Sequence, residues 1–170
     1  MNRFAKATSL NRQRWLLLAL CATVLAGCFG KKPPEAPKPA VLDVATVASA
    51  DLNPDGEGRA SPLVLRIYAL RALAEFEKAD FFALYEKDEQ VLAADLVKRD
   101  ELILKPGQTT TLLREFPPDA KFVAVVGAYR DVERSTWRAS LPLPPGAKGT
   151  IAIKADAKAV SLMLEKPAKE

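Results

Sequence analysis

The chain has 170 residues, with 25 lysines and arginines against 21 aspartates and glutamates, which gives a formal net charge of +4. Four of the basic residues and none of the acidic ones lie in residues 1–27, so residues 28–170 carry 21 of each sign. That remainder has no stripe of basic residues with interleaved aromatics, which excludes a nucleic-acid-binding protein. The chain also has no histidine, which excludes catalytic relays and metal sites that need imidazole.

The N-terminus combines basic residues, an apolar run over residues 15–25 and the sequence Leu25-Ala26-Gly27-Cys28. The run is shorter than the ~20 residues of a membrane-spanning helix and is typical of a secretory signal peptide. The sequence Leu25-Ala26-Gly27-Cys28 resembles the lipobox of bacterial lipoproteins. That resemblance implies a signal peptide over residues 1–27, cleavage between Gly27 and Cys28, and a diacylglycerol and an N-acyl chain on Cys28. The alternative is an ordinary secretory signal with a chance cysteine.

The residues after Cys28 indicate to which membrane the protein is carried and how its domain is connected to the lipid anchor. Phe29 rather than aspartate follows the cysteine, and Gram-negative lipoproteins of that pattern are usually carried to the outer membrane, where two or three acyl chains anchor permanently. Prolines in residues 30–40 favour an extended chain of about 3.1 Å per residue, so residues 28–40 form a lipidated tether of up to roughly 30 Å. With Cys21 removed and Cys28 lipidated, no thiol remains for a disulfide, a metal or a nucleophile.

Short β-rich runs alternate with turn signals beyond the tether, which indicates a mainly β domain over residues 41–166, with a tail at residues 167–170. The pattern predicts an eight-stranded antiparallel β-sandwich of two four-stranded sheets. In the second strand Leu63, Leu65 and Ile67 share one face and Arg66 lies on the other. The strands are expected at residues 41–50, 63–70, 101–104, 109–116, 122–130, 136–141, 150–155 and 160–165.

Residues 72–94 do not show this alternation of β-rich runs and turns, because they contain no glycine or proline and are rich in Ala, Leu, Glu and Lys. They predict a short helical insertion between strands two and three, in the form of two helices packed beside the sandwich. Asp80 and Asp88 are candidate caps at helix starts. The apolar face is expected to hold Phe81, Leu84, Tyr85 and Leu92.

The loop over residues 51–62 is the main candidate for a binding site, since long loops on a rigid scaffold carry function. It opens with the Asp-x-Asn-x-Asp-Gly pattern of a calcium-binding EF-hand, but Pro62 stands where the bidentate glutamate is required. We therefore expect no metal and favour a turn-rich connection. Carboxylates that meet in space could support glycoside hydrolysis, but scattered surface charge is the simpler interpretation, and we expect no enzyme and no small-molecule substrate.

Several short motifs follow one another along the chain in a fixed order. They are Leu52-Asn53-Pro54-Asp55, Gly58-Arg59, Ser61-Pro62, Leu65-Arg66-Ile67-Tyr68-Ala69-Leu70, Ala79-Asp80-Phe81-Phe82-Ala83-Leu84-Tyr85, Lys105-Pro106-Gly107-Gln108, Ala128-Tyr129-Arg130-Asp131 and Trp137-Arg138. Their order and spacing resemble the type VI secretion outer-membrane lipoprotein family, TssJ, also called SciN or VasD. The resemblance covers residues 41–143 and includes the lipobox.

The resemblance implies a transthyretin-like β-sandwich that is anchored to the periplasmic face of the outer membrane. It also implies a partner, the periplasmic C-terminal region of the inner-membrane subunit TssM, which forms with TssL the complex on which the contractile machine docks. The partner-binding residues then lie in the loop between the first two strands, and they are Asn53, Pro54, Asp55, Gly56, Glu57, Gly58 and Arg59. Arg66, Tyr68 and Trp137 are interpreted as sandwich core or rim.

A second hypothesis stays open on the sequence alone. The chain would then be a free-standing envelope lipoprotein whose sandwich binds a ligand such as a glycan or a calcium ion.

Overall fold

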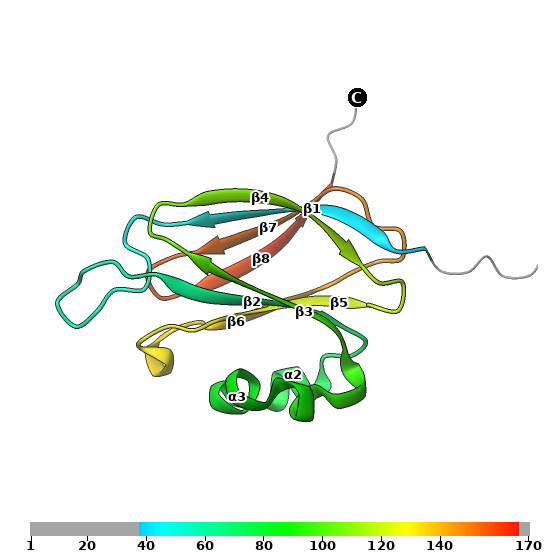
Figure 1. Ribbon diagram of the computed structural model, residues 1–170, viewed down its shortest axis with the longest axis horizontal. Helices are drawn as coiled ribbons and strands as arrows, with labels where there is room; N and C mark the ends of the chain where they lie inside the picture. The colour runs from blue at the N-terminus through cyan, green and yellow to red at the C-terminus, as the bar shows by residue number, and fades with distance from the viewer. Residues whose placement is uncertain (1–37, 167–170) are drawn as a thin grey trace, which may run out of the picture. The chain divides into compact units, whose positions relative to one another are not determined.

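The computed structural model describes residues 38–166, which form two four-stranded sheets packed face to face (Figure 1). One sheet has the strand order β4-β1-β7-β8, and the other has the order β3-β2-β5-β6. The predicted pair of four-stranded sheets is therefore confirmed. The strands are β1 (Ala40–Ala48), β2 (Leu63–Leu70), β3 (Leu96–Leu104), β4 (Thr109–Phe116), β5 (Phe122–Gly127), β6 (Arg138–Pro142), β7 (Thr150–Ala155) and β8 (Val160–Glu165).

One strand pairing differs from the predicted antiparallel arrangement. β1 runs parallel to β7, with Val44 opposite Ile151, whereas the other pairings between the named strands are antiparallel. The prediction of a wholly antiparallel sandwich is wrong at this point. Alternation of apolar residues specifies the buried face of a strand, but it says nothing about the direction of a neighbour that is distant in the sequence.

The hydrophobic core lies between the sheets and follows the alternation of the strands. In β1 every second residue is buried, from Ala40 to Ala48. In β2 the side chains of Leu63, Leu65 and Ile67 point into this core, as predicted. β5 is buried along almost its whole length, because Val123 and Val125 face the core while its alternate residues face the helices.

The helical insertion covers the outer face of the β3-β2-β5-β6 sheet (Figure 1). It consists of α2 (Ala74–Lys78), α3 (Phe81–Leu92) and the single 3₁₀ turn η2 (Ala93–Asp95). The Asp80 side chain accepts a hydrogen bond of 2.8 Å from the Ala83 amide and caps α3, as predicted. The helices bury Phe76, Leu84 and Leu92 against Tyr68, Leu70, Ala124 and Val126 of the sheet.

Asp88 directly follows a kink in α3, where the backbone of Lys87 is non-helical (φ −138°, ψ 31°), so the predicted second helix start is present. Its Oδ1 accepts a hydrogen bond of 2.9 Å from the adjacent Glu89 amide rather than from an amide two or three residues further on, as a cap would, and only 4% of Asp88 is exposed. Its carboxylate accepts hydrogen bonds from Arg99 at 2.8 Å and from the Tyr68 hydroxyl at 3.1 Å, and Arg66 lies 3.6 Å away. Burial alone would raise the pKa of Asp88, but these hydrogen bonds and positive charges outweigh burial and hold it below its usual value. The charge cluster ties the insertion to β2 and β3.

Four strand boundaries differ from those expected. β1 ends at Ala48, two residues early, where the chain turns into the following loop. β3 begins at Leu96 rather than near residue 101, because charged residues at this edge strand hide its alternation. β5 ends at Gly127, after which the Ala128 amide bonds to Val64. β6 begins at Arg138, since residues 128–137 form a connection that contains the 3₁₀ turn η3 (Val132–Arg134).

The pairings place four connections at one end of the sandwich, which we call the distal end. β1 begins at the opposite end of the sandwich and ends at the distal end. The first residue of β4 and the last residue of β7 pair with the last residues of β1, so these strand ends lie at the distal end as well. Backbone hydrogen bonds join the connections to each other and to neighbouring strand ends, as in Ser49 to Ala155, Gly107 to Ser49 and Thr136 to Lys158. The connections that make up the distal end are residues 49–62, 105–108, 128–137 and 156–159.

Replacement of Asp88 by alanine tests the charge cluster. It leaves the Arg99 and Arg66 guanidinium groups without their buried partner, so the free energy of unfolding in urea should fall by about 3–5 kcal/mol at pH 7. Because the folded-state pKa of Asp88 is lowered, the wild type holds this stability above the unfolded pKa of about 3.9 and loses it as the pH falls through the folded value. The difference between the two proteins should therefore shrink below pH 4.

Glu89→Ala is the matched control for this prediction. Glu89 is the next residue in α3 and lies 3.9 Å from Arg99, but its side chain is 76% exposed. Its loss should change the free energy of unfolding by less than about 0.5 kcal/mol. Equal effects of the two substitutions would contradict the role given to Asp88.

Candidate functional site

The loop that joins β1 to β2, residues 49–62, is fixed at its base by the buried side chain of Asn53. Only 4% of this residue is exposed, and its backbone has a positive φ of 47°. The side-chain Oδ1 accepts a hydrogen bond of 2.9 Å from the Arg130 amide, and Nδ2 donates one of 2.8 Å to the Pro62 carbonyl. The neighbouring Leu52 is fully buried, and its carbonyl accepts the Ser61 amide. The start and end of the loop are thus held together beside the exit of β5.

The family resemblance places Asn53 among the partner-binding residues, which stays a prediction, and within the domain its side-chain amide bonds to two backbone groups. Both ends of the amide are occupied by backbone groups inside the domain, which satisfies the donor and acceptor that burial would otherwise leave unpaired. Asparagine suits the position, because it tolerates the left-handed backbone better than most residues. Asn53 is therefore a positioning residue for the loop.

The tip of the loop is organised by Asp55. Its Oδ1 accepts hydrogen bonds of 3.0 Å from the Glu57 and Arg59 amides, and its Oδ2 accepts one of 2.8 Å from Arg59 Nε. The Asp55 amide donates to the Arg59 carbonyl at 2.9 Å, and Gly58 turns the chain with a φ of 79°. These bonds, the Arg59 amide first, hold the pKa of Asp55 below its usual value. The tip is a closed turn that presents the exposed residues Gly56, Glu57, Gly58 and Arg59.

The carboxylate of Asp55 is consequently engaged within its own loop. The EF-hand pattern that the loop begins requires carboxylate oxygens to converge on an ion, whereas here the oxygens face backbone amides and Arg59. Within residues 38–166 no group of three or more acidic, cysteine or histidine side chains is arranged to hold a metal ion.

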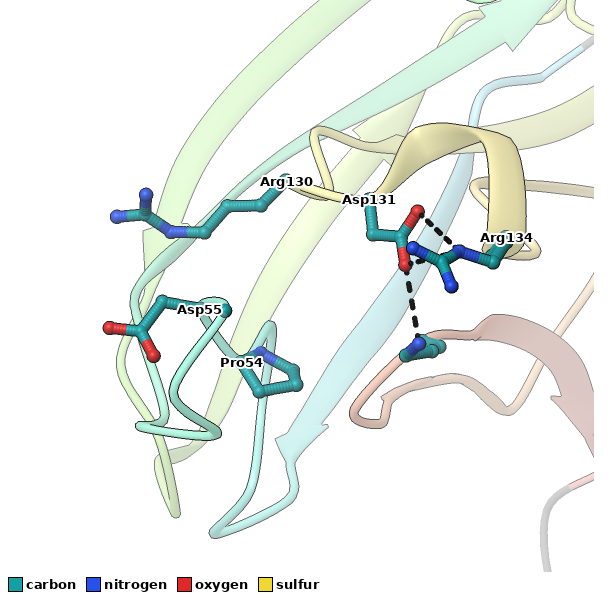
Figure 2. Close-up of a pocket in the computed structure, with 7 residues that line it drawn as sticks. Pro54, Asp55, Arg130, Asp131 and Arg134 are labelled. Atoms are coloured by element: carbon teal, nitrogen blue, oxygen red, sulfur yellow. Dashed lines mark hydrogen bonds and ion pairs between the residues drawn. The ribbon is translucent and has the colours of Figure 1, made fainter.

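A hollow of about 540 Å³ lies at the distal end between three segments (Figure 2). One side is formed by Pro54, Asp55 and Gly56 of the loop tip, and the other side is formed by Arg130, Asp131, Arg134 and Lys158. The hollow therefore brings together residues that are up to about a hundred positions apart in the sequence. Three of its side chains are positively charged and two are negatively charged.

Asp131 holds two of the positive charges in place. Its Oδ2 lies 3.1 Å from Arg134 Nε and 3.2 Å from Lys158 Nζ, and Figure 2 shows the contact with Arg134. Desolvation works against the charge of Asp131, but these hydrogen bonds, Lys158 first, keep its pKa below the usual value. The ion pairs join the connection between β5 and β6 to the turn between β7 and β8.

The sequence predicted Pro54, Asp55 and Gly56 as site residues, but it did not assign the other four residues of the hollow to a site. Arg130 and Asp131 belong to a motif of the family resemblance, yet nothing local marks Arg134 or Lys158, which read as ordinary charged turn residues. The pairing of β1 with β7 and the Asn53 bond to Arg130 bring them beside the loop. Conversely, Tyr68 is fully buried, and Trp137 packs against both hydrophobic clusters, as their interpretation as core and rim residues expected.

The predictions for the N-terminus lie outside the described residues. They include the signal peptide over residues 1–27, its cleavage between Gly27 and Cys28, the lipidation of Cys28 and most of the tether. The tail at residues 167–170 lies outside them as well. Between residues 38 and 166, none of the helices has the length and apolar character needed to cross a membrane.

Comparison with known proteins gives a consistent result. The model of the type VI secretion lipoprotein family, which includes VasD, EvfM and TssJ, matches residues 40–158, well over half of the chain. The crystal structure of the type VI secretion lipoprotein TssJ1 from Pseudomonas aeruginosa is 34% identical, with a TM-score of 0.73 over 78% of this chain and 100% of that one. No curated protein matches the chain.

Two further solved structures are similar. Lip from Serratia marcescens, described as a membrane-bound component of the type VI secretion system, is 28% identical with a TM-score of 0.68, over 73% of this chain and 97% of that one. A chain of a type VI membrane complex is 25% identical with a TM-score of 0.65, over 74% of this chain and 99% of that one. The similarity spans both sheets and is not confined to one motif.

Substitution of Asn53 tests the base of the loop. Asn53→Ala removes two hydrogen bonds, each of about 1 kcal/mol, and places alanine in a left-handed backbone that costs it roughly 1–2 kcal/mol. We expect the free energy of unfolding to fall by about 3 kcal/mol, and hydrogen exchange at the Arg130 amide to accelerate. Asn53→Gly is the matched control, since glycine adopts this backbone freely and should lose about 1 kcal/mol less. Unchanged protection of the Arg130 amide in both variants would contradict the anchoring role.

Proposed function

This chain belongs to the type VI secretion lipoprotein family, and we propose that it links the outer membrane to the periplasmic C-terminal region of TssM. In this role it is a structural subunit of the membrane complex that TssM forms with TssL, and it helps to dock the contractile secretion machine. It has no catalytic activity of its own. The support is the family itself and the similarity to a chain of a type VI membrane complex.

The proposal rests on the placement of the start of β1 and the loop of residues 49–62 at opposite ends of the sandwich. The tether leads into β1 at Ala40, and β1 delivers the chain to the loop of residues 49–62 at the distal end. Nine strand residues at about 3.3 Å each separate the two points by roughly 25–30 Å. A membrane anchor at one end and a partner at the other would thus be joined through a continuous strand in the middle of a sheet.

The anchor is the lipidated Cys28. Cleavage between Gly27 and Cys28 removes the signal peptide and leaves a cysteine that carries diacylglycerol and an N-acyl chain. Several acyl chains make membrane attachment effectively permanent, whereas one chain alone binds reversibly. Phe29 after the cysteine favours transport to the outer membrane, so that the sandwich faces the periplasm.

The partner surface is the tip of the loop. Gly56, Glu57, Gly58 and Arg59 are exposed there, and Pro54 and Asp55 are partly exposed. Because the Asp55 carboxylate accepts the hydrogen bonds that close the turn and Asn53 fixes its base, the tip loses little conformational freedom on binding, which favours affinity. The glycines also let a partner approach the backbone closely.

A binding measurement tests this assignment. All residues of both hydrophobic clusters lie between Ala40 and Leu164, so we expect residues 29–170 to fold without the signal peptide. This domain should bind a periplasmic fragment of TssM. Replacement of residues 55–59 by two glycines should weaken binding at least tenfold, measured by isothermal titration calorimetry, and should change the free energy of unfolding by less than about 1 kcal/mol, because Leu52, Asn53 and Ser61 are retained.

Two charge-neutral double variants sharpen the result. Glu57→Ala with Arg59→Ala removes the ion pair at the tip, and Arg71→Ala with Asp119→Ala removes an exposed ion pair that lies outside the four distal connections. Only the first double variant should weaken TssM binding. Full affinity after loop shortening would remove the loop assignment, and the absence of any complex between the folded proteins would remove the proposed function.

The anchor is tested in cells. Cys28→Ser cannot receive diacylglycerol through a thioether, so it should abolish type VI secretion. The binding domain of residues 29–170 does not contain this position, so the loss would come from the missing anchor and not from the TssM-binding surface. Metabolic labelling with a fatty acid should mark the wild type and not the variant. Secretion that persists in the variant at normal protein levels would contradict the anchoring role.

A further inference from the structure

Arg130 differs from the other charged residues that line the hollow at the distal end. Asp55 is engaged by Arg59, while Asp131 is engaged by Arg134 and Lys158. Arg130 is exposed, and no carboxylate within residues 38–166 lies within ion-pair distance of it, although its positive charge contributes, after the hydrogen bonds from Arg59 and Glu57, to the lowered pKa of Asp55. Figure 2 shows its side chain directed away from Asp131, on the side of the hollow where Asp55 lies.

The position of Arg130 is nevertheless fixed. Its amide donates to the buried Oδ1 of Asn53 at 2.9 Å, and Asn53 also holds the base of the loop tip. The backbone of Arg130 therefore keeps its place relative to Pro54 and Asp55, and its exposed side chain extends beyond it. An arginine presented in this way has its planar fork of donors available for a carboxylate, a geometry that arginine satisfies with two parallel hydrogen bonds.

We propose that the hollow receives an acidic segment of the partner, with Arg130 as the residue that pairs with a partner carboxylate. This inference rests on the proposed function, because the partner is the periplasmic region of TssM. It extends the binding surface from one loop to three connections, namely residues 49–62, 128–137 and 156–159.

Charge and shape favour an acidic peptide as the occupant. Three cations against two carboxylates give the lining one positive charge in excess, and both carboxylates are engaged by cations of this domain. A volume of about 540 Å³ accommodates several side chains. The hollow is also continuous with the loop tip, since Pro54, Asp55 and Gly56 belong to both, so a partner that contacts the tip is placed beside Arg130.

The test compares three single variants of residues 29–170 in binding to the TssM fragment. Arg130→Ala should weaken binding at least tenfold, and Arg130→Lys should weaken it about threefold, because lysine keeps the charge but not the bidentate fork. Arg71→Ala is the control, an exposed arginine outside the distal connections, and should change affinity less than twofold. The affinity of the Arg130→Ala variant should also depend less on salt concentration.

A second measurement reports directly on the contact between Arg130 and the TssM fragment. In a ¹⁵N-labelled domain, the side-chain Nε–H resonance of Arg130 should shift downfield when the TssM fragment is added. If Arg130→Ala binds like the wild type while shortening of residues 55–59 still abolishes binding, the hollow is not the site and the proposed function stands. If the folded wild type binds no TssM fragment, the proposed function and this inference fail together.

Discussion

The two hydrogen bonds of the buried Asn53 amide are the constraint on which the distal end depends. One bond reaches forward to the Pro62 carbonyl, and the other crosses 77 positions of sequence to the Arg130 amide. An amide that is buried without partners would cost several kcal/mol, so the folded domain keeps both bonds and with them one relative position of the two connections. The loop tip and the hollow therefore form one surface. Asn53 supports that surface at its base.

The helical insertion has a structural role that is separate from the distal end. It covers the outer face of one sheet, and the buried Asp88 and Tyr68 hold it there together with the partly exposed Arg66 and Arg99. Strands β2 and β5 are thus buried on both faces, which makes their sheet a rigid support for the segments that leave them at Leu63 and Gly127. The binding surface that we propose is carried on these two strand ends and not on the helices.

Charge at the distal end is local and mostly internally paired. The precursor has an excess of four positive charges, yet this excess resides in the first 27 residues and says nothing about the partner. At the hollow the relevant charges are arranged by Asp131, which holds Arg134 and Lys158. A net charge computed over the chain averages such features away, whereas the free energy of binding depends on which single groups remain available at a desolvated contact.

Local chemistry specifies those parts of this protein that could be predicted from its sequence. The alternation of apolar and polar residues indicated β1 and β2 as strands, and the glycine-free stretch before β3 indicated the helices. Asp80 marked a helix start because its side chain caps the next turn. Tertiary structure alone decided which strands are neighbours, and so it decided that β1 runs parallel to β7, that Asp88 is a buried ion-pair partner, and that Asn53 points inward. These outcomes depend on groups far apart in the chain, and periodicity carries no information about which distant group will supply a hydrogen bond or a charge.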